Sequence, residues 1–272
     1  MTSTVLNMDQ KPSTASKPVP IDISQPSVPL LRLVAVETRK MVDTRAGFWL
    51  VVLIVVANLL VTAALLLFGP DEALTFESFL GLASAPAGFL LPVLAILLVT
   101  SEWSQRSGLI TFGLEPRRGR VVTAKLLTAL VATVGTLVVA IAFGAAGTLL
   151  ADLTHDLADP WQMTAAGLTN VALALLLALL MAFAFGMALM SSPAAIVLYF
   201  VLPTVWTIVA STVPWVRDNL QEWADLNSAQ APLLSGEWAS GDEWLRLGVA
   251  ASIWVLAPLV FGVWRLLRSE VK

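Results

Sequence analysis

Long apolar stretches separated by short polar segments run along most of this sequence. A helix that crosses a bilayer needs about 20 mostly apolar residues, within a range of about 17–25, and six stretches fall within or above that range. They cover residues 46–68, 79–100, 126–151, 163–190, 194–213 and 247–264. The pattern predicts an all-α membrane protein with six transmembrane helices.

The fourth and fifth predicted spans come from one uncharged stretch between Pro160 and Val216. That stretch is too long for a single crossing. Ser191, Ser192 and Pro193 lie near its middle, and proline with small polar residues is typical of a break between helices. We therefore divide the stretch there into two spans joined by a turn.

Residues 30–45, ahead of the first span, have an amphipathic pattern. Apolar and small residues recur at helical spacing among basic ones, at Leu30, Val34, Thr38 and Met41. This spacing favours an N-terminal helix lying on the membrane surface. The alternative is a solvated helix that leads into the first span.

The segment 214–244, between the fifth and sixth spans, is rich in tryptophan. It contains Trp215, Trp223, Trp238 and Trp244. Tryptophan favours the headgroup region of a bilayer, so we expect short helices at that level before span six, in preference to a featureless loop.

Residues 1–29 contain five prolines among Ser, Thr and Lys. Such a segment has too few apolar residues to form a packed structure. We expect a disordered N-terminal tail over residues 1–29 and a transmembrane domain over residues 30–272. The first long apolar run starts only near Ala46, which does not match a secretory signal peptide.

Composition supports the membrane assignment and excludes several functions. Hydrophobic residues make up 57% of the chain and charged residues 13%, whereas soluble domains carry about 25% charge. The net charge is −3, so no nucleic-acid partner is expected. Cysteine is absent and His155 is the single histidine, which excludes disulfides, thiolate catalysis and Cys/His metal clusters.

Basic residues are distributed unequally between the polar segments. With the N-terminus in the cytoplasm, fourteen of the sixteen lysines and arginines lie inside, and only Arg217 and Arg246 lie outside. Short cytoplasmic loops carry an excess of lysine and arginine. We therefore expect both termini on the cytoplasmic side of a multi-pass membrane protein.

Motifs for independent chemistry are scarce. None of the five lysines is followed by Ser or Thr, so the chain lacks the Gly-Lys-Ser/Thr phosphate-binding loop. Ion pumps and proton-coupled carriers usually keep buried Asp, Glu, His or Lys side chains in their spans as relays. The predicted spans contain almost no ionisable residues, so an ion pump is disfavoured. Only the segment 152–156, with His155 and Asp156, offers acid–base groups for a membrane enzyme, and a lone loop histidine is more often simply solvated.

The segment from Glu102 to Lys125 carries the most informative pattern. It combines a helix-like stretch, a proline break and a basic cluster that enters the third span. This resembles the ABC-2 type permease family, the transmembrane subunits of ABC exporters. The matching positions are Glu102, Gly108, Leu114, Pro116, the arginines at 117, 118 and 120, and Lys125, with Leu109 where the family often has Thr and Thr111 as a substitute.

The resemblance implies a permease subunit of a bacterial ATP-driven exporter in the cell membrane. Two copies, expected as a homodimer, would pair with two separate ABC ATPase subunits, which would bind ATP and Mg. This chain would bind no cofactor and catalyse no reaction itself. The loop between spans two and three would form a cytoplasmic coupling helix, with contacts to the ATPase from Glu102, Arg106, Gly108, Thr111, Leu114, Pro116 and Arg117.

The family's spans two and five line its central cavity, so the resemblance directs attention to span five. There, one helical face carries Phe200, Thr204, Thr207 and Ser211, with Trp206 nearby. We expect these residues to line a substrate path without fixed charge, which suits apolar or amphiphilic cargo. The alternative is that the hydroxyls bond back to carbonyl groups one turn earlier.

Two other classes of function remain open. One is a membrane enzyme that depends on His155 or Asp156. The other is a membrane scaffold or sensor that does not transport. The sequence leaves the cargo open as well, since a drug, a lipid, a peptide or an antibiotic would each fit.

Overall fold

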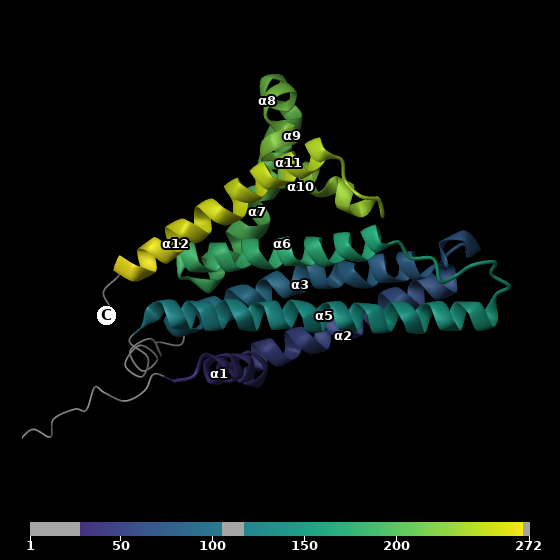
Figure 1. Ribbon diagram of the computed structural model, residues 1–272, viewed down its shortest axis with the longest axis horizontal. Coiled ribbons are helices and arrows are strands. Elements are labelled where there is room, and N and C mark those ends of the chain that lie inside the picture. The colour runs from purple at the N-terminus through teal and green to yellow at the C-terminus, as the bar shows by residue number, and fades with distance from the viewer. Residues whose placement is uncertain (1–27, 105–116, 269–272) are drawn as a thin grey trace, which may run out of the picture.

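The computed structural model of the protein describes residues 28–104 and 117–268, and these residues form helices without any strand (Figure 1). Six helical units are long and apolar enough to cross a membrane. They are α2 (Arg45–Phe68), α3 (Phe76–Ser104), α5 (Arg118–Thr154), α6 (Ala165–Leu189), α7 (Ser192–Thr212) and the unit Gly241–Arg268. The prediction of an all-α protein with six such helices is confirmed. Residues 1–27 of the predicted tail lie outside the described residues.

Several long helices extend past the apolar runs that predicted them. Helix α5 has 37 residues, which at about 1.5 Å per residue gives about 55 Å, well over the ~30 Å of a hydrocarbon core. Its predicted range began at residue 126 because Lys125 and the arginines before it ended the apolar run. Helical hydrogen bonding does not stop where hydrophobicity stops, so charged residues belong to the first two turns.

The sixth unit contains two α-helices joined by a wider turn. Helix α11 (Gly241–Ala251) leads through a π-helical turn (Ser252–Leu256) into α12 (Ala257–Arg268). A reciprocal cap starts α11, because the Ser240 side chain accepts from the Glu243 amide and Glu243 accepts from the Ser240 amide. This cap starts the helix ahead of the predicted span 247–264.

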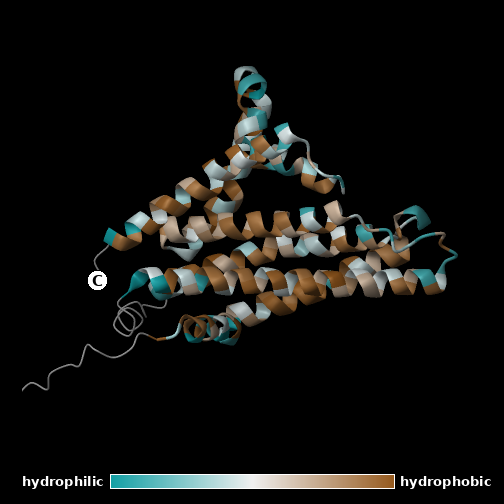
Figure 2. Cartoon of the chain, viewed as in Figure 1, coloured by the Kyte–Doolittle hydropathy of each residue, from teal (hydrophilic) through white to brown (hydrophobic). Residues whose placement is uncertain are grey.

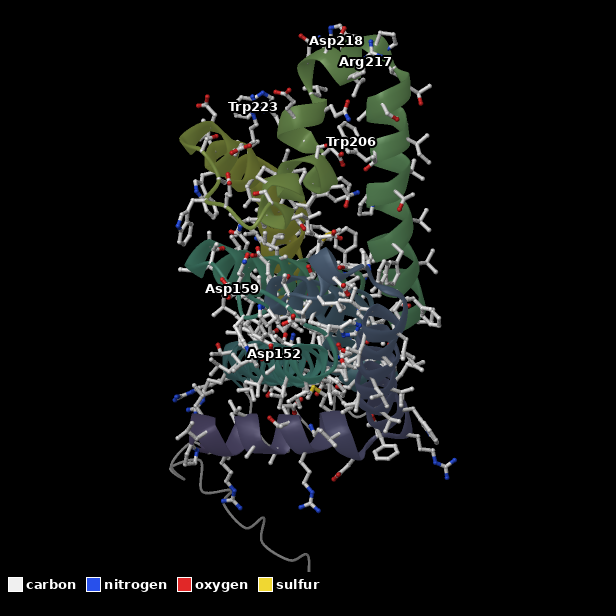
Figure 3. All side chains as sticks on the ribbon, turned by 90° about the vertical axis from the view of Figure 1, so that its right-hand side faces the viewer. Asp152, Asp159, Trp206, Arg217, Asp218 and Trp223 are labelled. Atoms are coloured by element: carbon white, nitrogen blue, oxygen red, sulfur yellow. The ribbon has the colours of Figure 1, made fainter. Side chains whose placement is uncertain are left out.

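Shorter helices lie in several of the remaining described segments. They are α1 (Leu30–Asp43), η1 (Asp71–Ala73), α8 (Pro214–Asn219), α9 (Gln221–Ala224), α10 (Leu226–Gln230) and η2 (Ala231–Leu234). Helix α1 is seen end-on in Figure 1, where α3, α5 and α6 are seen lengthwise, and lengthwise in Figure 3. It therefore lies across the direction of the bundle.

Helices α3 and α6 form the centre of the bundle. Phe183 and Met187 of α6 belong to one buried cluster with Ile96 and Val99 of α3. A Cβ atom on Gly186 would lie 3.3 Å from the Val99 side chain, so the small residue permits this close approach of the two helices. Figure 2 shows the long helices as mostly hydrophobic, with hydrophilic residues concentrated near their ends.

Both ends of α6 are fastened by residues from the last part of the chain. At its start, the Thr164 hydroxyl donates to the Gly236 carbonyl at 2.6 Å and accepts from the Gly167 amide. At its end, Arg265 of α12 donates to the Ala188 carbonyl at 2.7 Å. Thr164 thus caps the first turn of α6, and Arg265 satisfies one of the carbonyls that the last turn leaves unpaired.

Helix α7 starts beside the bundle and then leaves it. The hydroxyl oxygens of Ser192 in α7 and Thr100 in α3 lie 2.6 Å apart, and both side chains are buried. From there α7 runs away from α6 toward α8 (Figure 1). Much of its surface is apolar and exposed, including Val201, Val205 and Ile208, as expected of a helix in contact with lipid.

Candidate functional site

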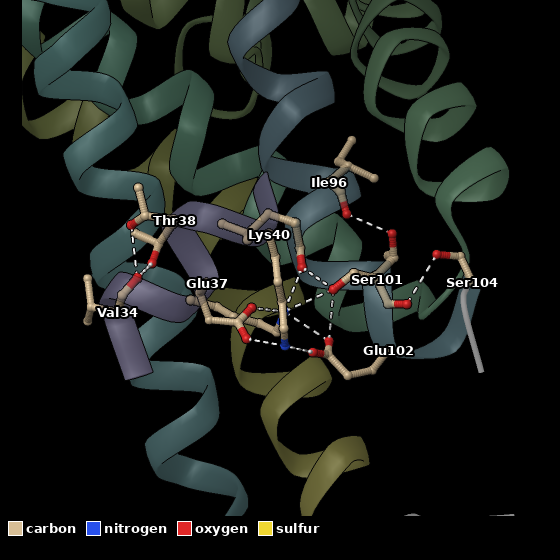
Figure 4. A network of polar contacts seen from close by, with 12 residues as sticks. Val34, Glu37, Thr38, Lys40, Ile96, Ser101, Glu102 and Ser104 are labelled. Atoms are coloured by element: carbon tan, nitrogen blue, oxygen red, sulfur yellow. Dashed lines mark hydrogen bonds and ion pairs between the residues drawn. The ribbon is translucent and has the colours of Figure 1, made fainter. Parts of the chain in front are cut away.

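Four charged side chains meet where α1, α3 and α5 converge, and we call this group the ion cluster (Figure 4). Glu37 and Lys40 come from α1, Glu102 from the last turn of α3, and Lys125 from the second turn of α5. Glu37, Glu102 and Lys125 are each at most 4% exposed. Three nearly inaccessible charges at one point hold together three elements distant in sequence.

Lys125 is the centre of the ion cluster. Its Nζ lies 2.7 Å from Glu37 Oε2 and 2.9 Å from Glu102 Oε2. It also donates to the Leu98 carbonyl at 2.7 Å and lies 3.1 Å from Ser101 Oγ. An ammonium group removed from water needs such a complete set of oxygen partners.

Lys40 lies on the solvent-facing side of the ion cluster. Its Nζ lies 2.7 Å from Glu37 Oε1 and 4.0 Å from Glu102 Oε1, and its side chain is 44% exposed. Burial alone would raise the pKa of Glu37, but the ammonium groups of Lys125 and Lys40 outweigh it and hold this pKa below its ordinary value. Two carboxylates and two ammonium groups give the cluster no formal net charge.

The position of Glu37 follows from the helical period of α1. Glu37 lies three residues after Val34 and four before Met41, so it shares a helix face with apolar side chains that pack toward α5 and the core. The Thr128 hydroxyl of α5 donates to the Val34 carbonyl at 3.3 Å, which adds a second link between the helices. A carboxylate on an inward face requires a cation opposite, and Lys125 supplies it.

The ion cluster also fixes the two helices that bracket residues 105–116. Glu102 precedes this segment on α3 and Lys125 follows it on α5, and their charged groups are in contact. The predicted contact residues Arg106, Gly108, Thr111, Leu114 and Pro116 lie outside the described residues, as does the predicted coupling helix. Arg117 is exposed and directly precedes α5.

Glu102 differs from the sequence-based expectation. We expected a polar contact exposed on a loop, but Glu102 lies within α3 and its side chain is only 2% exposed. The apolar run that predicted span two ends at Thr100, while the helix continues to Ser104. Glu102 is therefore available to the ion cluster and not to a direct contact with another protein.

Two arginines of the predicted basic cluster bind backbone within the chain. Arg118 donates to the Leu266 carbonyl of α12 at 2.7 Å, and Arg120 donates to the Val28 carbonyl. Cations near the carboxyl end of a helix compensate its exposed carbonyls. These arginines thus fasten α12 and the chain before α1 to the start of α5.

The structure does not bring the predicted path residues together as one free surface. Phe200 stacks against Phe89 of α3 with ring centroids 6.4 Å apart, and Trp206 is half-buried. Thr204 and Ser211 are exposed, but their hydroxyls donate to carbonyls of their own helix, at Phe200 and Ile208. The alternative of local hydrogen bonding accounts for both hydroxyls.

Thr207 links α7 to the segment that follows it. Its hydroxyl lies 2.8 Å from Asp225 Oδ1 and 3.0 Å from the Pro203 carbonyl, and it accepts from Asn227. Asp225 is fully buried and also accepts from the amide and hydroxyl of Ser228. One buried carboxyl group therefore joins α7 to the start of α10.

The pair Thr207→Val and Thr204→Val tests this link. Thr207→Val removes a hydrogen bond to a buried carboxyl group, so we expect the free energy of unfolding to fall by about 1–3 kcal/mol. Thr204→Val, the matched control on the same helix, should change it by at most about 0.5 kcal/mol because the residue is exposed. Thermal unfolding in detergent measures both variants, and equal effects would contradict the link.

His155, the residue considered for enzyme chemistry, lies at the end of the bundle away from the ion cluster. Its Nε2 is 3.9 Å from Asp71 Oδ1, and its Nδ1 is 3.0 Å from the Thr154 hydroxyl. Across residues 28–104 and 117–268, no three histidine or acidic side chains are placed to hold a metal ion. The ion cluster is accordingly the most elaborate polar site of the described chain.

One feature of the sequence could have predicted the ion cluster, namely the acidic residue Glu37 on the inward face of helix 30–43. Glu37 is an acidic residue at an inward position of an amphipathic helix, and buried charges in proteins are paired. Such a position predicts a cation on a neighbouring helix, and Lys125 is the only lysine between the start of the first predicted span and the end of the last. Which face of α5 meets α1 depends on packing, so the pairing itself needed the structure.

Comparison of the sequence with known protein families and with curated proteins finds no match.

Proposed function

We propose that this chain is the permease subunit of an ATP-driven ABC exporter of the ABC-2 type. Each copy would form half of the substrate path, a second copy would complete it, and separate ABC ATPase subunits would bind ATP with Mg. Six apolar helices in one chain are consistent with a multi-pass membrane protein, and the pattern of residues 102–125 supports the family.

The observation that carries this proposal is the ion cluster at the base of the segment 105–116. A loop that receives force from an ATPase must pass it to the spans, which requires rigid attachment of both its ends. Glu102 and Lys125 provide that attachment through a contact of 2.9 Å, and Glu37 extends it to α1. A displacement of the loop would then move α1, α3 and α5 as one body.

The distribution of charge supports an orientation with this end in the cytoplasm. Basic residues of α1, the start of α5 and the end of α12 lie at the same end of the bundle as the ion cluster. Asp152 and Asp159 lie at the opposite end, whereas Arg217 and Asp218 belong to α8, to the side of the bundle (Figure 3). Cytoplasmic loops carry an excess of lysine and arginine, and the end of the bundle that holds the ion cluster has this excess.

In this orientation the short helices acquire distinct roles. Helix α1 would lie at the inner surface, with Leu31 and Val36 exposed toward lipid and its charged residues toward headgroups. The segment around Gly236 would lie at the outer surface, because Gly236 accepts from Thr164 at the start of α6, whereas α8 lies at the far end of α7, to the side of the bundle (Figure 1). The cargo is expected to be apolar or amphiphilic, since the exposed face of α7 carries hydroxyls such as Thr204 and no charge.

Purification from native membranes in mild detergent tests the proposal. We expect an ABC ATPase to elute with the chain in equal amounts, and ATP hydrolysis to occur in the complex but not in the chain alone. In vesicles that contain the complex, ATP should drive accumulation of a fluorescent amphiphile, and an ATPase variant unable to hydrolyse ATP provides the control. A chain that elutes without any ATPase, or a complex whose hydrolysis moves no cargo, would contradict the proposal.

A further inference from the structure

A groove of about 250 Å³ lies between α2, α3 and α5, near the end of the bundle that holds the ion cluster. It is lined by apolar and small residues of four helices, including Met41, Val51, Val55, Leu91, Leu94 and Gly135. Leu94 lies one turn before Leu98, whose carbonyl accepts from Lys125 of the ion cluster. We call this feature the apolar groove.

The apolar groove is open at the surface of the bundle. Val51 and Val55 are 39% and 38% exposed, and a Cβ atom on Gly135 would meet nothing within 4 Å. Among the described residues that line the groove, Thr136 alone has a polar side chain, and its hydroxyl donates to the Ala132 carbonyl of the same helix. The groove therefore favours an apolar occupant, because a polar group would find no free hydrogen-bonding side chain there.

A cation lies near one end of the apolar groove. Arg45 begins α2, six residues before Val51, which is about 9 Å along the helix axis. Its side chain is exposed and forms no ion pair with the residues that the structure describes. Phe48 and Trp49, in the same turn of α2, are 51% and 65% exposed. Exposed tryptophan favours the headgroup level of a bilayer, so Arg45 lies at the level of lipid phosphates.

We propose that the apolar groove holds an acyl chain of an anionic phospholipid whose phosphate group binds Arg45. The acyl chain fills the space beside Gly135, where the bordering side chains otherwise lack dispersion contacts. The phosphate accepts charge-assisted hydrogen bonds from the guanidinium group. The unpaired cation distinguishes this occupant from an uncharged apolar molecule. The inference requires only that the helices cross a bilayer, and it does not depend on transport.

The test uses the full chain in mild detergent, with phosphatidylglycerol and phosphatidylcholine of identical acyl chains as probes. Native mass spectrometry measures the lipid that stays bound to each chain. We expect one phosphatidylglycerol molecule per chain, bound about fivefold more tightly than phosphatidylcholine, because one arginine attracts the anionic lipid. The unfolding temperature should rise with the concentration of phosphatidylglycerol, since the lipid binds the folded chain.

Gly135→Leu tests the groove itself. The leucine side chain occupies the space of the acyl chain, so binding of both lipids should weaken by about tenfold or more. Gly88→Leu in α3 is the matched control, because nothing lies within 4 Å of a Cβ there either and Gly88 does not line the groove. Unfolding temperatures without added lipid check that both variants fold.

Arg45→Gln tests the headgroup contact, and it stays decisive even where Gly135→Leu does not fold, because Arg45 is exposed. The affinity for phosphatidylglycerol should fall to that for phosphatidylcholine, whose own affinity should not change. Arg217→Gln is the matched control, since Arg217 is also exposed and pairs with Asp218 on α8, away from the groove.

Each result decides for or against the proposal. Loss of the lipid preference in Arg45→Gln, with loss of binding in Gly135→Leu, supports the site. Equal binding in Gly135→Leu and Gly88→Leu overturns it, as does a preference that Arg45→Gln leaves unchanged. If no lipid stays bound and Gly135→Leu alters the oligomeric state instead, a second copy of the chain fills the groove and the proposal is wrong.

Discussion

The Lys125→Met variant is expected to lose about 3–5 kcal/mol of stability, the usual cost of removing one partner from a buried ion pair. Methionine keeps the length and the apolar stem of lysine but leaves Glu37 and Glu102 without their shared cation. Both carboxyl groups are almost inaccessible to water. Lys40, which is 44% exposed, cannot replace the contacts to the Leu98 carbonyl and Ser101.

Thermal unfolding in detergent, followed by tryptophan fluorescence, measures this loss. Lys40→Met is the matched control, because it removes a partly exposed ammonium and leaves Lys125 with both carboxylates; it should cost about 1 kcal/mol or less. Combining Lys125→Met with Glu37→Gln and Glu102→Gln should restore part of the stability, since the unpaired charges are then gone. If Lys125→Met were no less stable than Lys40→Met, the ion cluster would not be buried as described.

The same variants separate stability from function. Because the pKa of Glu37 is lowered, its stabilisation is present at neutral pH and is lost only as the pH falls through that lowered pKa, in the acid range. A pH near neutrality therefore leaves Glu37 ionised during an assay.

The triple variant Lys125→Met, Glu37→Gln, Glu102→Gln should fold yet show ATP hydrolysis uncoupled from transport, if the ion cluster transmits force as proposed.

A second large effect is expected at Gly262, where α12 touches α6. A Cβ atom there would lie 2.6 Å from the Met187 carbonyl carbon and 2.7 Å from the Ala188 amide nitrogen. Backbone atoms cannot rotate aside as a side chain can, so Gly262→Ala must push α12 away from α6. The bond from Arg265 to Ala188 and the burial of Leu266 would be disturbed together.

We expect Gly262→Ala to destabilise the protein by about 2–3 kcal/mol, the upper part of the usual range for overpacking. Gly135→Ala in α5 is the matched control, because nothing lies within 4 Å of a Cβ at that position. It should be neutral or slightly stabilising, since alanine favours helix over glycine by about 1 kcal/mol. Unfolding temperatures in detergent give the comparison, and equal values for the two variants would refute the close contact.

The sequence predicted the long helices well because a helix that crosses the hydrocarbon core must be apolar over about 20 residues. Apolar runs of sufficient length identified six spans, and all six correspond to long helices. The ends were less predictable: Glu102 lies inside a helix that outlasts its apolar run. The course of α7 away from α6 was not predictable, because it depends on contacts between distant segments.

The candidate site was harder to predict than the fold. Glu102 and Lys125 were both noticed, but as parts of a family pattern and not as partners in an ion cluster. The inward position of Glu37 contained the missing information, yet one acidic residue on a helix face does not specify its cation. For Thr207, local spacing suggested a row of hydroxyls, whereas Asp225, eighteen residues later, determines the contact.

The fastening of α6 has a consequence for how the chain is made. The contacts that Gly236 and Arg265 make to the ends of α6 form only after this helix has been synthesised, because both residues follow it. During insertion, α6 therefore has its own N-cap from Thr164 but lacks these two tertiary contacts. A ribosome that stops before Arg265 thus releases a protein in which the Ala188 carbonyl lacks the arginine that binds it in the complete bundle.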